Sequence, residues 1–139
     1  MKININGVSI TLTKEQLIEI DKQTKNIKTI DDINSYKDAV DILSEKVNPN
    51  RTNQEELETI IRAVNFIDND NKIWEADFSN KELYKYIPYF EMLGSGWSFH
   101  AVSFFYYCSF FSVGLYYKNK ESAEIMAKRF NKLYNLVLG

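Results

Sequence analysis

Cysteine, histidine and proline are scarce in this chain. Its 139 residues contain one Cys, Cys108, one His, His100, and two Pro. A single Cys excludes an internal disulfide framework and a thiol-based structural zinc site, and a single His removes most multi-histidine metal sites. No pattern in the sequence selects a nucleophile and a base that would act together. We therefore expect a protein that is not an enzyme and that holds no cofactor or metal.

A strong excess of either charge is also missing. The chain carries 17 basic and 19 acidic residues, so its net charge of -2 predicts neither a polyanionic nor a polycationic partner. Hydrophobic residues at 45% and charged residues at 26% are typical of a globular protein. The length suits one α+β domain over residues 1–139, with a hairpin and helices in 1–73 and a sheet with a final helix in 74–139.

Long apolar segments are limited to one candidate. No apolar stretch of signal-peptide length follows Met1, which favours a cytoplasmic location. Residues 92–117 contain no charged residue and are long enough to span a membrane. Recurrent serines, the turn Gly94-Ser95-Gly96 and an excess of aromatic residues over Leu and Ile favour strands instead, so we expect no membrane association.

Local signals predict a hairpin followed by three helices. Asn6-Gly7 joins strands at 2–5 and 8–12, because both turn positions accept a positive φ. Thr13 with Gln16 predicts a helix to about residue 25. Ser35 with Asp38, and Thr52 with Glu55, predict the starts of a second and a third helix, and Asp68 to Lys72 should end the third.

The second half predicts an aromatic sheet. Strand candidates cover residues 84–92, 97–107 and 110–118, and three antiparallel strands are the simplest arrangement. Alternation along the middle strand puts Trp97, Phe99, Ala101, Phe105 and Tyr107 on one face and Val102, Phe104 and Tyr106 on the other. Asn119 can cap one C-terminal helix that packs on the sheet. The fold class expected is therefore α+β.

Five blocks, spread over nearly the whole chain, follow one known pattern. They are residues 5–13 with Glu15-Gln16, residues 35–39, residues 74–78, residues 85–90, and residues 123–130 with Leu133-Tyr134. Together they resemble a family of small uncharacterised proteins encoded by gut Bacteroidales and their phages. In that family the first two blocks are the opening and a short second helix, and the last three are a Trp-x-Pro-Asp-Trp block, a Lys-Tyr-x-Pro-x-Phe block and the closing helix. Ala76 and Phe78 depart from the Trp-x-Pro-Asp-Trp pattern, and the family's Ser-Arg pair is missing before Leu115. The resemblance implies a phage or mobile-element accessory protein, without an activity, and then a location in the host cell cytoplasm.

Two short motifs have simpler explanations than ligand binding. Asp68-Asn69-Asp70-Asn71 resembles the start of a calcium loop, but Ile73 and Ser79 stand where that loop needs Gly and Glu. Gly94-Ser95-Gly96 lacks the Lys and Ser or Thr of a phosphate loop and lies between strand candidates. We interpret the first as a helix-end loop and the second as a turn.

Charge and aromatic residues are distributed unevenly. Residues 1–79 contain 10 basic and 15 acidic residues, whereas residues 80–139 contain 7 and 4 and also 16 of the 20 aromatic residues. Aromatic rings with nearby cations suit single-stranded nucleic acid, and Lys128, Arg129 and Lys132 are the candidates for that role. The same rings can instead form the core under helices, or a surface for another protein or for a second copy in a homodimer.

Three functions follow from these observations. The leading hypothesis is a non-enzymatic phage or mobile-element accessory protein that binds a host protein and inhibits a host or defence function. The alternatives are a protein that sequesters a small molecule or nucleotide and a single-stranded nucleic-acid-binding protein. The candidate ligand-binding or partner-binding residues are all on the predicted sheet: Tyr84, Tyr86, Trp97, His100, Phe104 and Tyr106.

Overall fold

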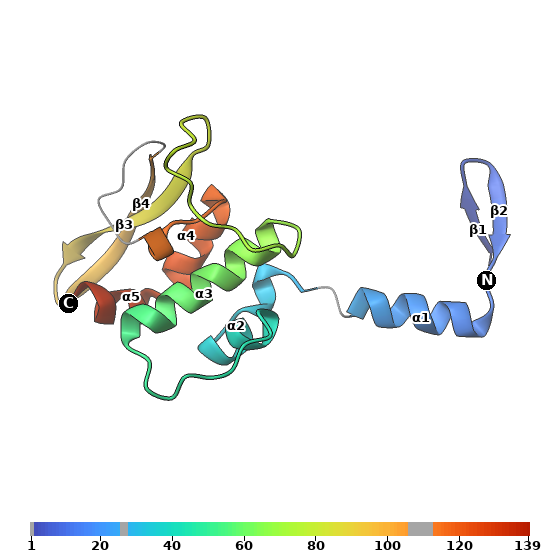
Figure 1. Cartoon of the computed structure of the whole chain (residues 1–139), viewed down its shortest axis with the longest axis horizontal. Coiled ribbons are helices and arrows are strands. Elements are labelled where there is room, and N and C mark those ends of the chain that lie inside the picture. The colour runs from blue at the N-terminus through green and yellow to red at the C-terminus, as the bar shows by residue number, and fades with distance from the viewer. Residues whose placement is uncertain (1, 26–27, 106–112) are drawn as a thin grey trace.

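The α+β class is confirmed by a computed structural model, which describes residues 2–25, 28–105 and 113–139. These residues contain five α-helices and two separate antiparallel hairpins. Figure 1 shows a body built around helix α3, and an arm formed by the first hairpin and helix α1 that projects away from it. Within the described ranges, no helix is long and apolar enough to cross a membrane.

The arm has the local structure that its turn and cap signals predict. Strand β1 (Lys2–Ile5) pairs with β2 (Val8–Thr11), and the turn residues Asn6 and Gly7 have φ values of 51° and 80°. Helix α1 (Lys14–Lys25) begins after Thr13, which exchanges hydrogen bonds of 2.9 and 3.1 Å with Gln16. This is the predicted capping box.

Helices α2 (Tyr36–Ile42) and α3 (Asn53–Asp68) pack side by side in the body. The side chains of Ser35 and Thr52 cap them as predicted, at 3.2 and 3.1 Å from the amide nitrogens three residues on. A short 3-10 helix, η1 (Ile30–Asp32), precedes α2. Helix α3 ends where expected, because Asp70 and Asn71 adopt φ values of 55° and 58° that a right-handed helix cannot continue.

The predicted three-stranded sheet is not confirmed. Strand β3 (Lys85–Leu93) pairs with β4 (Gly96–Phe105), but the third strand is reduced to one bridge between Tyr86 and Tyr117. Part of the predicted strand is instead the 3-10 helix η2 (Val113–Leu115), and residues 106–112 lie outside the described ranges. The segment after η2 is bound to helix α3 instead. Asn65 of α3 donates to the carbonyl of Tyr116 and accepts from the amide of Lys118, both at 2.9 Å.

The predicted alternation along β4 is wrong beyond Phe99, because the strand contains a β-bulge. Phe99 pairs with Phe90 and Ala101 pairs with Tyr89, so His100 is an extra residue without a counterpart on β3. Phe99 and Val102 consequently both pack against the core, although they are three residues apart. A regular strand would have placed them on opposite faces.

The sequence predicts one C-terminal helix, but the structure has two, α4 (Lys120–Arg129) and α5 (Asn131–Leu138), which are separated at Phe130. Asn119 caps α4 as predicted, through bonds of 2.9 and 3.2 Å. The carboxamides of Asn131 and Asn135 both donate to the backbone carbonyl of Trp97, at 3.2 and 2.9 Å, and this fixes α5 against β4. Both α4 and α5 contact the β3–β4 hairpin.

The core lies between α3 and the C-terminal helices. Its α3 residues Leu57, Ile60, Ile61 and Val64 are at most 1% exposed. They pack against fully or almost fully buried residues of the last third of the chain, namely Tyr117, Ala123, Met126, Ala127 and Tyr134. The core therefore joins α3 to the last third of the chain, and the β3–β4 sheet covers the edge of this core.

Candidate protein-binding surface

Exposed aromatic side chains gather where β3 begins and β4 ends. Tyr84 and Phe104 are 51% and 53% exposed, and their ring centroids are 4.7 Å apart. Tyr86 lies 6.3 Å from Tyr84 and packs edge to face with it, and the neighbouring Leu83 is 52% exposed. We call Leu83, Tyr84, Tyr86 and Phe104 the Tyr84 cluster.

The Tyr84 cluster is held on a rigid base. The backbone of Tyr86 exchanges hydrogen bonds of 2.9 and 2.7 Å with Tyr117, whose side chain is fully buried. On the other side of β3, the buried Lys85 donates from Nζ to the carbonyl of Asn80 at 2.7 Å and lies over the Phe78 ring. The start of β3, which carries Tyr84 and Tyr86, is therefore held both by the bonds to Tyr117 and by the contacts of Lys85. Rigid aromatic side chains of this kind are the usual anchors of protein interfaces.

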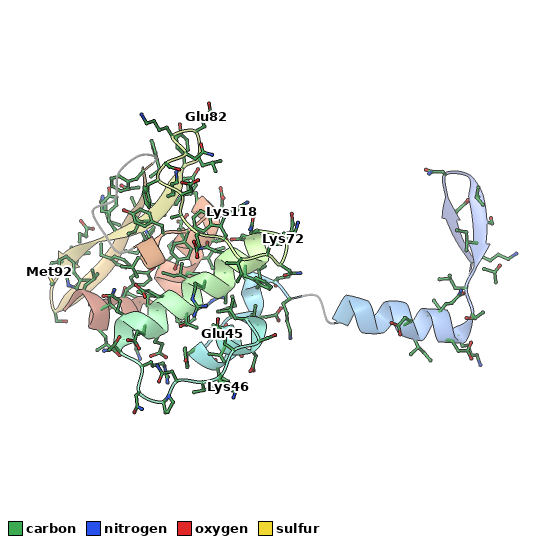
Figure 2. The ribbon with its side chains drawn as sticks, in the orientation of Figure 1. Glu45, Lys46, Lys72, Glu82, Met92 and Lys118 are labelled. Atoms are coloured by element: carbon green, nitrogen blue, oxygen red, sulfur yellow. The ribbon has the colours of Figure 1, made fainter. Side chains whose placement is uncertain are left out.

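Trp97 lies at the opposite end of the hairpin. Figure 2 labels Glu82, close to the Tyr84 cluster, and Met92, which pairs with Trp97, at opposite ends of β3. Trp97 and Phe104 are seven residues apart on β4, which corresponds to roughly 23 Å of extended chain. The two residues therefore belong to different surfaces.

Trp97 lines an apolar pocket, which we call the Trp97 pocket. The pocket has a volume of about 230 Å³, and its walls come from residues 87–90, Leu115 and α5, with no charged residue among them. The indole Nε1 of Trp97 is buried without a hydrogen-bond partner in the described part of the chain. A nucleotide would need donors for its phosphates, and these walls offer no cation.

His100 occupies a third position, on the outer face of the hairpin. Its Nδ1 lies 3.3 Å from a carboxylate oxygen of Glu91, and its ring lies 5.2 Å from that of Tyr89. Nothing in this surrounding resembles a pocket, because Glu91, Tyr89 and His100 are all substantially exposed. The imidazole therefore has a neighbour, Glu91, that can orient it.

The six predicted partner-binding residues therefore do not converge on one site. Tyr84, Tyr86 and Phe104 form one cluster, whereas Trp97 and His100 lie elsewhere on the hairpin. Tyr106 lies outside the described residues. This separation counts against a single nucleotide pocket built from these side chains.

The three basic residues proposed for nucleic acid have mixed surroundings. Lys128 pairs with Glu124 at 3.0 Å and lies 5.5 Å from the Phe99 ring centroid. Arg129 donates from Nη1 to the carbonyls of Ile30 and Ile33, at 2.8 and 2.9 Å. Lys132 is exposed. Arg129 therefore holds the segment before α2 in place.

All three basic residues line an open groove beside the start of α2. The groove also contains Glu56, and none of the Tyr84 cluster contributes to it. Single-stranded nucleic acid requires stacking rings beside the cations. The exposed rings and the basic groove are at different places, which counts against that alternative.

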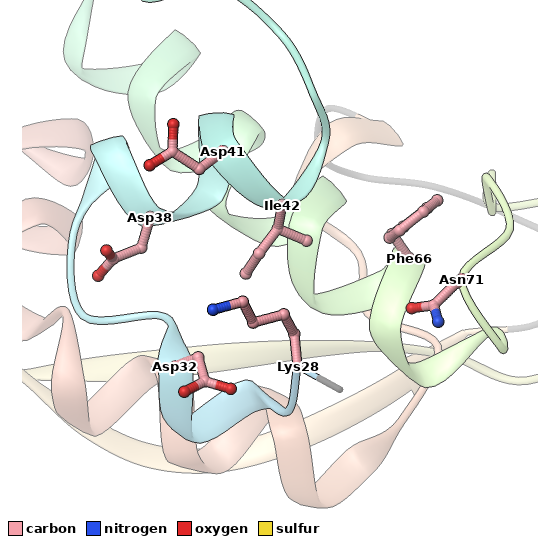
Figure 3. A pocket seen from close by; sticks show the side chains of 7 residues that line it. All are labelled: Lys28, Asp32, Asp38, Asp41, Ile42, Phe66 and Asn71. Atoms are coloured by element: carbon pink, nitrogen blue, oxygen red, sulfur yellow. The ribbon is translucent and has the colours of Figure 1, made fainter. Parts of the chain in front are cut away.

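An acidic pocket lies between η1, α2 and the end of α3. Figure 3 shows the Lys28 ammonium extending towards the space between the side chains of Asp32 and Asp38, with the Asp41 carboxylate directed away from it. Each carboxylate already has a structural partner: Asp32 accepts from the Thr29 amide, Asp38 from the Asn34 amide and Asp41 from Lys37. Over the described residues, no group of three or more acidic, His or Cys side chains could hold a metal ion.

Burial alters the acidity of three groups in the body. Desolvation raises the pKa values of the Tyr117 and Tyr134 hydroxyls, which contact each other in the core. Burial also raises the pKa of Asp68, although its bond from Ser122 opposes that change. These groups support the fold and are not part of the exposed surface.

Sequence reasoning found the rings but not their grouping. It omitted Leu83, and it did not anticipate the Trp97 pocket along the edge of β3. Pro88 was the available signal for that edge, because proline in a sheet favours an edge strand. Comparisons with protein families, curated proteins and solved structures returned no match, so the function has to be argued from the geometry of the chain itself.

Proposed function

We propose that the chain is a non-enzymatic accessory protein of a phage or other mobile element that binds and inhibits a host protein. The exposed Tyr84 cluster is the observation that supports binding of a protein. Two large rings that are each about half exposed, and in contact with each other, form an apolar anchor of the kind that protein interfaces bury. The phage origin and the host partner derive from the family resemblance.

A protein partner accounts for the cluster better than a small ligand does. The cluster consists of exposed rings in mutual contact, and it lines neither the Trp97 pocket nor the basic groove. A flat partner surface can cover these rings and exclude water from them. A nucleotide would need a concave site with convergent donors.

The test compares two variants that each remove exposed aromatic rings from the same hairpin. Tyr84→Ser with Phe104→Ser removes the centre of the cluster, and Tyr89→Ser removes a 42% exposed ring that lies next to His100. Tagged wild type and both variants serve as baits in lysate of a gut Bacteroidales host, with quantitative mass spectrometry as the readout. A specific partner should be captured by wild type and Tyr89→Ser and lost with the double variant.

The partner is then purified and its affinity measured directly. Loss of two anchor rings should weaken Kd at least tenfold, since about 1.4 kcal/mol corresponds to a factor of ten. Equal affinities of the two variants would exclude the Tyr84 cluster as the binding surface. Capture of nucleic acid in place of protein would support the alternative function.

A further inference from the structure

In the arm formed by residues 2–25, none of the side chains that the structure describes is buried. All four residues of β2 are exposed, with Val8 at 60% and Ile10 at 39%, and Ile18 of α1 is 61% exposed. A two-stranded hairpin or a 12-residue helix is marginally stable alone in water. The arm therefore requires a surface to pack on.

The body offers an unpaired strand edge at β3. Tyr86 directs its N–H and C=O towards Tyr117, so the peptide groups of every second residue after it, Pro88, Phe90 and Met92, point to the same edge. Within the described ranges, no strand pairs with β3 on this side beyond the bridge at Tyr86. Pro88 has no N–H to donate, so the edge that can accept a strand runs from Phe90 to Leu93.

The Trp97 pocket lies along this same edge. Four consecutive residues, 87–90, contribute to its wall, so the pocket reaches the edge of the strand. Trp97, Leu57 and Tyr134 also line it, so it continues from this edge under the core-facing side of the β3–β4 hairpin. Tyr89 and Leu138, which also line it, are 42% and 44% exposed, so the pocket is accessible from solvent. Its volume of about 230 Å³ is below the usual range for drug-sized ligands and suits aliphatic side chains.

The N-terminal hairpin matches both features. Val8 and Ile10 are two residues apart on β2, so they share one face, and each strand of the hairpin has a free edge. The arm, residues 2–25, contains four basic and three acidic residues, net +1, whereas residues 28–139 contain 13 and 16, net -3. The opposite charges favour contact between the arm and the body.

The geometry of the arm points to the body of another molecule. Helix α1 has 12 residues and is therefore about 18 Å long, and Figure 1 shows it directed away from its own body with the hairpin at its far end. A second copy can receive the hairpin without any reversal of the arm. Reciprocal exchange of two arms gives the two-fold symmetry that is commonest in homo-oligomers.

We propose that the hairpin of one copy pairs with the β3 edge of a second copy, at Phe90 to Leu93, and inserts an aliphatic side chain of β2 into the Trp97 pocket. The added strand supplies hydrogen bonds to the edge, and the side chain covers the apolar walls. This contact is at the opposite end of the β3–β4 hairpin from the Tyr84 cluster, so a dimer leaves that cluster accessible. It also differs from a contact through Phe104 and Tyr106, which the sequence offers as partner-binding residues.

The oligomeric state provides the first test, with a matched pair of variants. Light scattering of the full chain at tens of micromolar should give twice the chain mass of 16.3 kDa. Ile10→Asp should give the mass of one chain, and Ile125→Asp on α4 should remain dimeric, although both isoleucines are 39% exposed. A wild-type mass of one chain, or equal behaviour of the two variants, would overturn the proposal.

Disulfide trapping identifies the contact itself and does not depend on the stability of a destabilised variant. Two chains that both carry Cys108→Ser, one with Ser9→Cys and the other with Met92→Cys, are mixed and oxidised mildly. The yield of cross-linked heterodimer should be at least ten times the yield obtained with Val47→Cys in place of Met92→Cys. Val47 is a matched control, because Val47 and Met92 are similarly exposed, at 46% and 52%.

Two results of the trapping experiment would contradict the exchange. Equal yields for the Met92 and Val47 variants would mean that the hairpin does not bind the β3 edge. A chain carrying both Ser9→Cys and Met92→Cys that closes into a cross-linked monomer at low concentration would mean that the arm folds back on its own body.

Discussion

The hydroxyl groups of Tyr117 and Tyr134 lie 2.9 Å apart in the core, where the two residues are 0% and 4% exposed. One oxygen donates and the other accepts, so each satisfies a polar group that would otherwise be buried without a partner. The contact joins the segment that bridges to β3 with helix α5. It therefore links the sheet to the C-terminal helices.

Removing both of these hydroxyls should cost less than the sum of the two single removals. Tyr117→Phe or Tyr134→Phe leaves the other hydroxyl buried and unpaired, and each should lower the free energy of unfolding by about 1 to 3 kcal/mol. The double variant leaves no orphan, so its loss should be smaller than the sum of the two single losses. Urea unfolding of the four proteins measures this, and additive losses would contradict the pairing.

The same pair predicts a loss of stability at alkaline pH. Burial raises the pKa of both hydroxyls above the ordinary tyrosine value of 10.0, so the folded state favours their neutral forms. Their contribution is complete below pH 10.0 and is lost as pH rises further, because the unfolded chain then ionises first. Wild type should lose more stability above that pH than Tyr117→Phe/Tyr134→Phe does. Parallel pH profiles from urea unfolding would contradict this expectation.

Arg129 should matter for stability far more than its neighbour Lys128. Arg129→Leu removes two charge-assisted bonds to the carbonyls of Ile30 and Ile33 and should cost about 2 to 3 kcal/mol. Lys128→Ala removes an exposed pair with Glu124 and a contact with the Phe99 ring, which together are worth about 1 kcal/mol or less. Thermal unfolding distinguishes the two, and equal effects would mean that Arg129 does not hold the 30–33 segment.

This difference also decides how nucleic-acid binding should be tested. A variant that changes Arg129 would lose structure as well as charge, so Lys128→Glu with Lys132→Glu is the cleaner choice. We expect no measurable binding of a single-stranded oligonucleotide to wild type near physiological salt. A micromolar, salt-sensitive signal that the double variant abolishes would contradict this and favour the nucleic-acid alternative.

Deletion of His100 should be tolerated, because it is the extra residue of the β4 bulge. Without it, Phe99 still pairs with Phe90 and Ala101 with Tyr89, and Phe99 and Val102 stay on the core face. We expect a loss of about 1 kcal/mol or less, the scale of strand-propensity effects. Deletion of Ser103 should cost about 3 kcal/mol, because it exchanges the faces of Phe104 and Phe105.

Circular dichroism and urea unfolding of the two deletion variants provide the measurement. A greater loss of stability for the His100 deletion than for the Ser103 deletion would show that the bulge itself is required. That result would mean that the twist that the bulge imposes on the β3–β4 hairpin contributes more to stability than the pattern of side chains on its two faces.

Local signals in the sequence were enough to predict the starts of the helices and the first hairpin. Asn6-Gly7, the Thr13 and Thr52 capping boxes and the Asn119 cap all use atoms within three residues of one another. Such short-range hydrogen bonds form whatever the rest of the chain does. The identity of these elements is therefore a property of the sequence alone.

Tertiary contacts decided the sheet, the C-terminal helices and the site. Asn65 binds residues 51 and 53 positions away and holds the segment after η2 against α3. Among the described residues, β3 therefore has only the Tyr86–Tyr117 bridge on that edge. The bulge at His100 and the break at Phe130 let β4 and α5 fit the same core, and no local signal marks them. Arg129, which composition placed among candidate phosphate contacts, binds a carbonyl 99 residues away. These features depend on which distant groups become buried together, and spacing along the chain does not encode that.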